Sequence, residues 1–302
     1  MTKMTAPCPK CSRESQHAFR TKDYNQRVTG ESFDYYRCPS CGIVFLAPVP
    51  PDLEKYYPSE YHSPPSTPDE MEMLARREKY KIDLVKEFVS AGNLLEIGPS
   101  WGAFCLNAKN AGFTVNAIEM DSACCRFLSD VVGVNALHGS EILPLLDQVD
   151  PCDVAVLWHV VEHLPDPWRV LQAVSDKLNP GGILIIAAPN PDSLQFKAQG
   201  KRWPHVDAPR HVMLIPYGAL SRNLEQYGMK TVRITTRDPG AHEFNLFGWR
   251  FLFANLSGNT GAYAWKALYA FGTLVGKLLS PFEKSKDRGS TYTAVFQKET
   301  GK

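Results

Sequence analysis

Residues 94–104, LLEIGPSWGAF, join an apolar run to two glycines and then to an expected helix. Glycine-rich turns between a strand and a helix bring backbone amides close to a bound nucleotide. A dinucleotide loop has the spacing G-x-G-x-x-G, whereas three residues separate Gly98 from Gly102 here. Glu96 precedes this turn, and its carboxylate would repel a pyrophosphate but favour a ligand with an ammonium and a sulfonium.

A second carboxylate, Glu119, ends the next apolar run about twenty residues further on, where an acid accepts hydrogen bonds from both ribose hydroxyls. Glu96, Gly98, Gly102 and Glu119 together predict a site for an adenosine ligand without phosphates. The alternative is a tight strand-to-helix connection that binds nothing.

Two polar segments follow neighbouring expected strands, at the edge of the sheet where ligands bind in open α/β folds. They supply His159, Glu162 and His163, and then His205, Asp207, Arg210 and His211. Histidine removes protons near neutral pH, so we predict His211 as the first candidate for a general base, followed by His159 and His163. Alternatively, Glu162 and His163 only stabilise a turn, and the second segment is a solvated loop.

Two C-x2-C turns lie near the N-terminus, with Cys8 and Cys11 in the first and Cys38 and Cys41 in the second. Four thiolates brought together in this way hold a structural Zn²⁺ ion in a closed tetrahedral site. Two redox pairs are the alternative. The other four cysteines are expected to pack as small apolar residues of the core: Cys105, Cys124, Cys125 and Cys152.

Residues 94–237 resemble class I S-adenosylmethionine-dependent methyltransferases of the ubiquinone-biosynthesis-like, type 23 branch. LLEIGPSWGAF looks like their first motif, AIEMD (117–121) like the ribose-binding motif, DVAVLWHVVEHLPDP (153–167) like the fourth-strand motif, and NPGGILIIAAPNPD (179–192) like the turn and fifth strand. The resemblance implies transfer of a methyl group from S-adenosylmethionine to oxygen or carbon of a small polar acceptor.

The resemblance also implies which residues contact this methyl donor. They are Glu96, Gly98, Gly102, Glu119, Met120, Ser140 and Trp158. Many relatives have an aspartate beside the adenine where this chain reads HGSEI, so Ser140 or Glu141 must serve there. Tyr56, Tyr57 and Tyr61 resemble tyrosines that reach over the donor or acceptor in relatives, and the alternative is that they cover the core.

A zinc ribbon joined to this branch resembles enzymes of bacterial sugar, polysaccharide and natural-product pathways. The acceptor implied is a sugar or glycoconjugate intermediate, including lipid-linked ones. Two rival functions remain open at this point. One is an RNA methyltransferase that grips nucleic acid with the zinc ribbon, and the other is a non-catalytic module that binds S-adenosylmethionine.

Short apolar runs alternate with helical patterns from residue 94 onwards, which predicts an α/β fold with a Rossmann-like, seven-stranded methyltransferase sheet. Strands are expected at 94–97, 114–119, 134–137, 153–158, 183–188, 230–236 and 291–297. Helices are expected over 69–89, from Gly102, Asp121 and Asp166, and over 216–228. We place a zinc-ribbon domain at 1–65, a Pro/Ser linker at 63–68, and the methyltransferase domain at 66–302.

An aromatic-rich segment with a basic end, residues 238–289, interrupts this pattern as a helical insertion before the last strand. Extra helices packed on the core, a substrate lid, a dimer surface and a peripheral membrane contact are its alternative roles. The chain of 302 residues has a formal net charge of +1, which disfavours a nucleic-acid partner. Residues 1–10 lack the apolar region of a secretory signal, and no run of 18 uncharged apolar residues occurs, so we expect a cytoplasmic protein.

Overall fold

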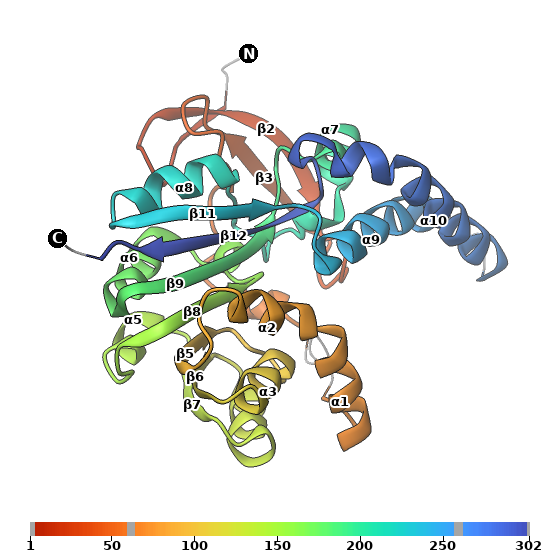
Figure 1. The fold of residues 1–302 in the computed structure, drawn as a ribbon. Helices are drawn as coiled ribbons and strands as arrows, with labels where there is room; N and C mark the ends of the chain where they lie inside the picture. The colour runs from red at the N-terminus through yellow and green to blue at the C-terminus, as the bar shows by residue number, and fades with distance from the viewer. Residues whose placement is uncertain (1–3, 59–63, 257–261, 301–302) are drawn as a thin grey trace.

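The computed structural model describes residues 4–58, 64–256 and 262–300. These residues form two sheets with helices around the larger one, and a helical hairpin extends from the body (Figure 1).

The larger sheet has seven strands in the order β11-β12-β9-β8-β5-β6-β7, which confirms the predicted Rossmann-like sheet. Its strands are β5 (Gly92–Ile97), β6 (Phe113–Glu119), β7 (Asn135–His138), β8 (Cys152–Trp158), β9 (Leu178–Pro189), β11 (Met229–Thr235) and β12 (Thr291–Lys298). The pairs among β5 to β9 are parallel, whereas β12 is antiparallel to both β9 and β11. The carboxyl ends of β5, β6, β8 and β9 therefore meet at one edge of the sheet.

The central strands are buried on both faces because helices cover both. Along β9, Ile183 and Ile185 belong to one apolar cluster, and Leu184 and Ile186 belong to the other. The first cluster also contains residues of α1 (Pro68–Arg77), α2 (Lys79–Lys86) and α3 (Ala103–Asn110), and Phe127 of α4 (Ser122–Phe127) packs against it. The second contains residues of α5 (Ile142–Leu146), α6 (Pro167–Lys177) and α8 (Tyr217–Glu225).

Local sequence explains the predicted helix starts. The Asp166 side chain accepts a hydrogen bond from the Arg169 amide, and Pro167 occupies the first turn of α6, where its missing N–H costs nothing. Asp121 caps α4 in the same way. The single helix expected over 69–89 is wrong, because the chain forms α1 and α2 with a break at Glu78. The break lets Met71 of α1 and Val85 of α2 reach the same apolar cluster.

The turn expected at 179–182 is also different, because β9 already begins at Leu178 and runs through these residues. Leu178 pairs with Cys152 and Ile183 pairs with Val154. Between these two pairs β9 therefore advances by five residues while β8 advances by two. The glycines and proline are therefore taken up as an irregularity within the strand.

The smaller sheet has the order β1-β2-β3-β4-β10 and is antiparallel. Its strands are β1 (Thr5–Pro7), β2 (Glu14–Lys22), β3 (Ser32–Arg37), β4 (Val44–Leu46) and β10 (Met213–Leu214). The last strand comes from the segment after β9, directly beyond His211. Tyr35 and Phe45 of this sheet share an apolar cluster with Leu95 and Ile97 of β5. The N-terminal segment thus packs on the same core as the larger sheet.

Residues 238–289 contain α9 (Pro239–Leu256) and α10 (Ala262–Lys284), which confirms a helical insertion before β12. The two helices pack against each other and project from the body (Figure 1). None of the helices in the described part of the chain combines the length and the apolar character that crossing a membrane requires.

Candidate functional site

In the glycine turn after β5, the backbone takes conformations that favour glycine and passes close to neighbouring side chains. Gly98 and Gly102 have φ values of +69° and +79°, which side-chain-bearing residues rarely adopt, and Ser100 between them has +52°. A Cβ atom at Gly98 would lie only 2.6 Å from Cγ2 of Val160. Since Val160 follows His159, the glycine turn and the histidine segment after β8 are in direct contact.

Glu119 lies at the end of β6 and closes the turn from the other side. Its Oε2 accepts a hydrogen bond from the Ser100 amide (2.9 Å), and its Oε1 accepts one from the Asp121 amide (2.8 Å). Burial raises the pKa of this carboxyl above its ordinary value, against these backbone hydrogen bonds. A carboxylate oxygen accepts more than one hydrogen bond, so both oxygens keep capacity for ribose hydroxyls.

Glu96 is fully enclosed at the end of β5. The Cys105 thiol donates a hydrogen bond to its Oε2 at 2.9 Å. Burial raises the pKa of Glu96 to about 8, although the Cys105 hydrogen bond and the charge of Lys81 act in the opposite direction. A cation placed beside Glu96 would favour its ionised form.

Lys81 is a residue that the sequence prediction missed. It lies on α2, is 9% exposed, and holds its ammonium 5.0 Å from the centroid of the Trp158 ring. Its ammonium forms an ion pair with Glu78 at 3.0 Å. Lys81 shares a helix face with Val85 and Phe88, at i, i+4 and i+7, and a lysine on an apolar face was the signal available in the sequence.

The other expected donor contacts lie at the same edge of the sheet. Trp158 ends β8, is 8% exposed, and packs edge-on against Phe104 of α3. Met120 directly follows β6 and is exposed, and its carbonyl oxygen lies 3.1 Å from Nε2 of His138. Ser140 follows β7 and is also exposed.

His159 and Glu162 form the first part of a polar cluster beyond β8. His159 has a φ of +58°, a strained conformation for a residue with a side chain. Its Nδ1 lies 3.4 Å from Oε1 of Glu162, and its ring packs 4.5 Å from that of Phe244 on α9. Glu162 is 1% exposed, and neither carboxylate oxygen has a hydrogen-bond partner among the described residues. Burial alone would raise the pKa of Glu162, but His159 and the charge of His211 hold it below its ordinary value.

His163 and His211 complete this cluster. Their rings pack edge to face with centroids 4.6 Å apart, and Glu162, His163 and His211 each bring one side-chain nitrogen or oxygen within 4.8 Å of the others. The Tyr57 hydroxyl is 2.8 Å from Nδ1 of His163. Burial lowers the pKa of His163 to about 4, which keeps the ring neutral at pH 7.

The hydrogen bonds of His211 fix its tautomer. Its Nδ1 donates to the carbonyl oxygen of His205 at 2.8 Å, because a carbonyl only accepts. The lone pair of the neutral ring is therefore on Nε2, which lies 3.9 Å from Oδ2 of Asp207. His205 itself is buried, and desolvation lowers its pKa to about 3. His211 thus has the geometry of a base whose protonated form faces two carboxylates, Asp207 and Glu162.

Arg210 lies in the same segment and links Asp207 to the N-terminal segment. It is fully buried, donates to Asp207 (2.9 and 2.7 Å) and Asp23 (3.1 and 2.7 Å), and also donates to the carbonyl oxygen of Tyr56 at 2.9 Å. These bonds hold the loop against the N-terminal segment. Tyr61 lies outside the described residues.

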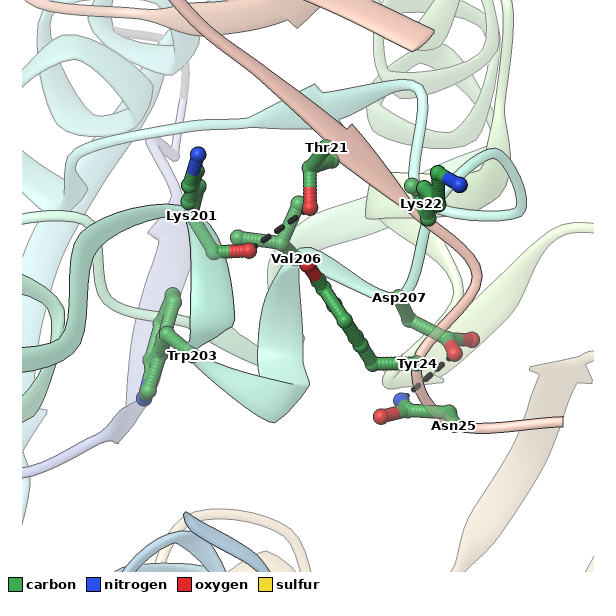
Figure 2. A pocket seen from close by; sticks show the side chains of 9 residues that line it. Thr21, Lys22, Tyr24, Asn25, Lys201, Trp203, Val206 and Asp207 are labelled. Carbon is green, nitrogen blue, oxygen red and sulfur yellow. Dashed lines mark hydrogen bonds between the residues drawn. The ribbon is translucent and has the colours of Figure 1, made fainter. Parts of the chain in front are cut away.

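A small pocket lies beside this junction, between β2 and the loop that contains Trp203, Val206 and Asp207 (Figure 2). The Thr21 hydroxyl donates to the carbonyl oxygen of Lys201 at 2.7 Å, and the Asn25 amide donates to Asp207 at 2.6 Å. None of its lining residues belongs to the glycine turn, so this pocket is separate from the donor site predicted above.

The four N-terminal cysteines meet in space. Sγ of Cys8 is 3.6 Å from Sγ of Cys41, and Sγ of Cys11 is 3.6 Å from Sγ of Cys38, while all four sulfurs lie within 4.8 Å of one another. Tetrahedral coordination with Zn–S bonds of about 2.3 Å separates sulfurs by about 3.8 Å. The donor set and the spacing both fit a zinc ion.

Comparisons with known proteins agree with the fold of the larger sheet. A curated relative, a ubiquinone biosynthesis O-methyltransferase from Caulobacter sp. (strain K31), is 28% identical over 102 residues, which span 32% of this chain and 40% of that protein. The chain therefore matches about two fifths of the length of that relative.

Two solved structures share the fold. One is a Galdieria sulphuraria protein described as a sarcosine dimethylglycine methyltransferase (15% identity, TM-score 0.50, 77% of this chain and 85% of that chain). The other is a SAM-dependent methyltransferase from Archaeoglobus fulgidus (18% identity, TM-score 0.50, 76% and 94%).

A family model described as a methyltransferase domain matches residues 73–234, which is more than half of the chain. With its seven-stranded sheet, the chain therefore belongs to this family, the class I S-adenosylmethionine-dependent methyltransferases.

Proposed function

We propose that this protein transfers the methyl group of S-adenosylmethionine to oxygen or carbon of a small polar acceptor, with His211 as the proton acceptor. The observation that carries the proposal is the contact between Gly98 and Val160, because it joins the donor turn to the segment of His159 and Glu162. Methyl transfer needs mainly this alignment and, for a hydroxyl or carbon acid, removal of one proton.

Each residue proposed to bind S-adenosylmethionine contacts the ribose, the adenine or the methionine part. Glu119 accepts hydrogen bonds from the ribose hydroxyls, while Met120 and Ser140 lie on the adenine side. The backbone of Gly98 and Gly102 borders the methionine part, and Glu96 faces its positive charges. Lys81 is our addition to this set: a nearly buried ammonium beside Trp158 and Glu96 suits the carboxylate of the methionine part.

When bound, the donor supplies an electrophilic methyl group on a sulfonium. His211 Nε2 takes the acceptor proton as the new bond to the methyl carbon forms, and S-adenosylhomocysteine is released. Asp207 and Glu162 stabilise the resulting imidazolium. His159, paired with Glu162, is the second proposed base. His163, with its pKa near 4, is a weak base, and we assign it with Tyr57 to positioning His211.

A sugar or glycoconjugate intermediate is our proposed acceptor. Its hydroxyl and ring-carbon protons require a base of the kind that His211 provides, and methylation on oxygen has a precedent in the name of the Caulobacter relative. We also propose that Cys8, Cys11, Cys38 and Cys41 bind a structural Zn²⁺ and that residues 1–65 form the zinc-ribbon domain, joined to a methyltransferase domain at 66–302.

The test is transfer of label from methyl-labelled S-adenosylmethionine to separate pools of nucleotide sugars, lipid-linked sugars and RNA. Label in a sugar fraction, lost with His211→Ala, supports the proposal. Label in RNA would overturn the assignment of the acceptor, and the absence of label in every pool with a donor-binding protein would favour a non-catalytic module.

A further inference from the structure

Helix α10 presents a continuous apolar stripe to solvent. Its residues Tyr263, Phe271, Leu274, Leu278 and Phe282 are 93%, 49%, 54%, 65% and 60% exposed. Their separations of eight, three, four and four residues place them along one side of the helix. Scattered exposed apolar residues need no explanation, but an aligned row of five large ones marks an interaction surface.

The other side of α10 is already occupied, so the stripe has no way to turn inward. A Cβ atom at Gly272 would lie 2.7 Å from Cα of Arg250, which shows how closely α9 and α10 cross. Further along, the buried Glu283 accepts hydrogen bonds from Nε1 of Trp249 and Nε2 of Gln195, each at 2.8 Å. These contacts hold the base of the hairpin to α7 (Leu194–Gln199), and the hairpin extends from there away from the sheet (Figure 1).

The exposed charged residues of α10 are all lysines. Its charged residues are Lys266, Lys277, Lys284 and Glu283, and the glutamate is the buried one. The lysines are exposed and lie eleven and seven residues apart, close to three and two whole helical turns. They therefore form a row along one edge of the apolar stripe.

We propose that this face of α10 binds the surface of an anionic lipid bilayer. An apolar row at the depth of the acyl boundary, with lysines at the level of the headgroups, is the arrangement of a helix that lies in a membrane interface. Each lysine there gains from the negative surface potential. A second copy of the chain fits less well, because its α10 would bring another row of lysines and no exposed carboxylate from that helix.

The test is co-sedimentation of the full chain with vesicles of phosphatidylcholine alone or mixed with phosphatidylglycerol. We expect binding to the mixed vesicles that weakens with added salt. Phe271→Glu with Leu274→Glu should lower the partition coefficient by roughly tenfold or more, since it places charge in the apolar row. Val131→Glu, at another exposed apolar residue, is the matched control and should bind like the wild type.

A second variant tests the charges without touching the apolar row. Lys266→Glu, Lys277→Glu and Lys284→Glu together should weaken binding to the anionic vesicles by roughly a hundredfold. The triple change of the exposed Lys86, Lys197 and Lys230 to glutamate is its control for net charge. Equal loss with both triple variants would overturn the proposal, as would wild-type protein that leaves anionic vesicles unbound. A dimer in analytical ultracentrifugation that Phe271→Glu with Leu274→Glu dissociates would overturn it in favour of a second copy.

Discussion

Asp23 and Arg210 are 187 residues apart in the sequence and form an ion pair in which neither side chain has any exposed surface. Nη2 of Arg210 lies 2.7 Å from Oδ1 of Asp23 and 2.7 Å from Oδ1 of Asp207. This arginine therefore fastens the segment that carries His211 to the N-terminal segment. The N-terminal segment, which also carries the four-cysteine cluster, is thereby joined to the candidate site by buried hydrogen bonds.

Replacing Asp23 tests this connection. Asp23→Asn removes one of the two carboxylates that the buried guanidinium contacts and leaves Asp207, so we expect the free energy of unfolding to fall by about 1.5–3 kcal/mol. Urea denaturation measures this change. Glu72→Gln, which breaks an exposed ion pair with Arg76, is the control and should leave the unfolding midpoint nearly unchanged. Equal midpoints for Asp23→Asn and the wild type would show that Arg210 does not depend on this partner.

The proposed base is tested by kinetics. His211→Ala should lower kcat by about 10²–10⁴-fold while the Kd for S-adenosylmethionine stays the same, because Nε2 acts on the acceptor. His159→Ala should cause a smaller loss if His211 is the principal base. His17→Ala changes a histidine of β2 that pairs with Asp34, and it should keep full kcat. Full activity of the double variant His159→Ala/His211→Ala would rule out both bases.

The pH dependence of stability tests the environment of Glu96. Its pKa is about 8 in the folded protein against an ordinary value of 4.5, so between these values the folded state binds more protons than the unfolded state. Stability therefore falls as the pH rises through this window, and the full cost of ionisation is present above pH 8. Glu96→Gln removes that cost.

We thus expect ligand-free Glu96→Gln to match the wild type near pH 5 and to be more stable by roughly 3–5 kcal/mol above pH 8. Thermal unfolding across pH 5–9 measures the difference. A wild-type curve that runs parallel to that of the variant would mean that Glu96 stays ionised throughout.

The zinc site is tested by metal content. Cys38→Ser should reduce zinc from one equivalent per chain to well below one and lower the thermal midpoint, because a structural zinc ion stabilises the fold that supplies its ligands. Cys125→Ser changes a buried cysteine of α4 and should keep its zinc. Zinc-free wild-type protein with an unchanged midpoint would point to thiols that need no metal.

Strong local patterns made the sheet predictable. Runs such as 153–158 and 183–188 have the length and apolar character of buried strands, and Asp166 with Pro167 marks a helix start by its own chemistry. The break at Glu78 was not predictable, since Glu78 is an ordinary helix-forming residue, and Met71 and Val85 on either side of it pack into the same apolar cluster. Tertiary contacts overrode propensity there.

The part of the site that lies directly after the strands was predictable, because the carboxyl ends of parallel strands meet at one edge of the sheet. The positions of His159 and His211 after neighbouring strands brought them together in the prediction. Their pairing with Glu162 and Asp207, and the tautomer of His211, depend on distances that no sequence pattern contains. Arg210 illustrates the converse: it stood among the candidate residues, but its partner Asp23 belongs to a segment 187 residues away, and it is the structural anchor of the loop.

The most direct test of the account is calorimetry of S-adenosylmethionine with the wild type and with Glu119→Ala. We predict binding to the wild type and a loss of about a hundredfold in affinity for the variant, because the ribose hydroxyls lose a charged hydrogen-bond acceptor. Met73→Ala, at an exposed residue of α1, should bind like the wild type. No heat with S-adenosylmethionine or S-adenosylhomocysteine, together with tight binding of NAD, would contradict the assignment of the glycine turn to a cationic methyl donor.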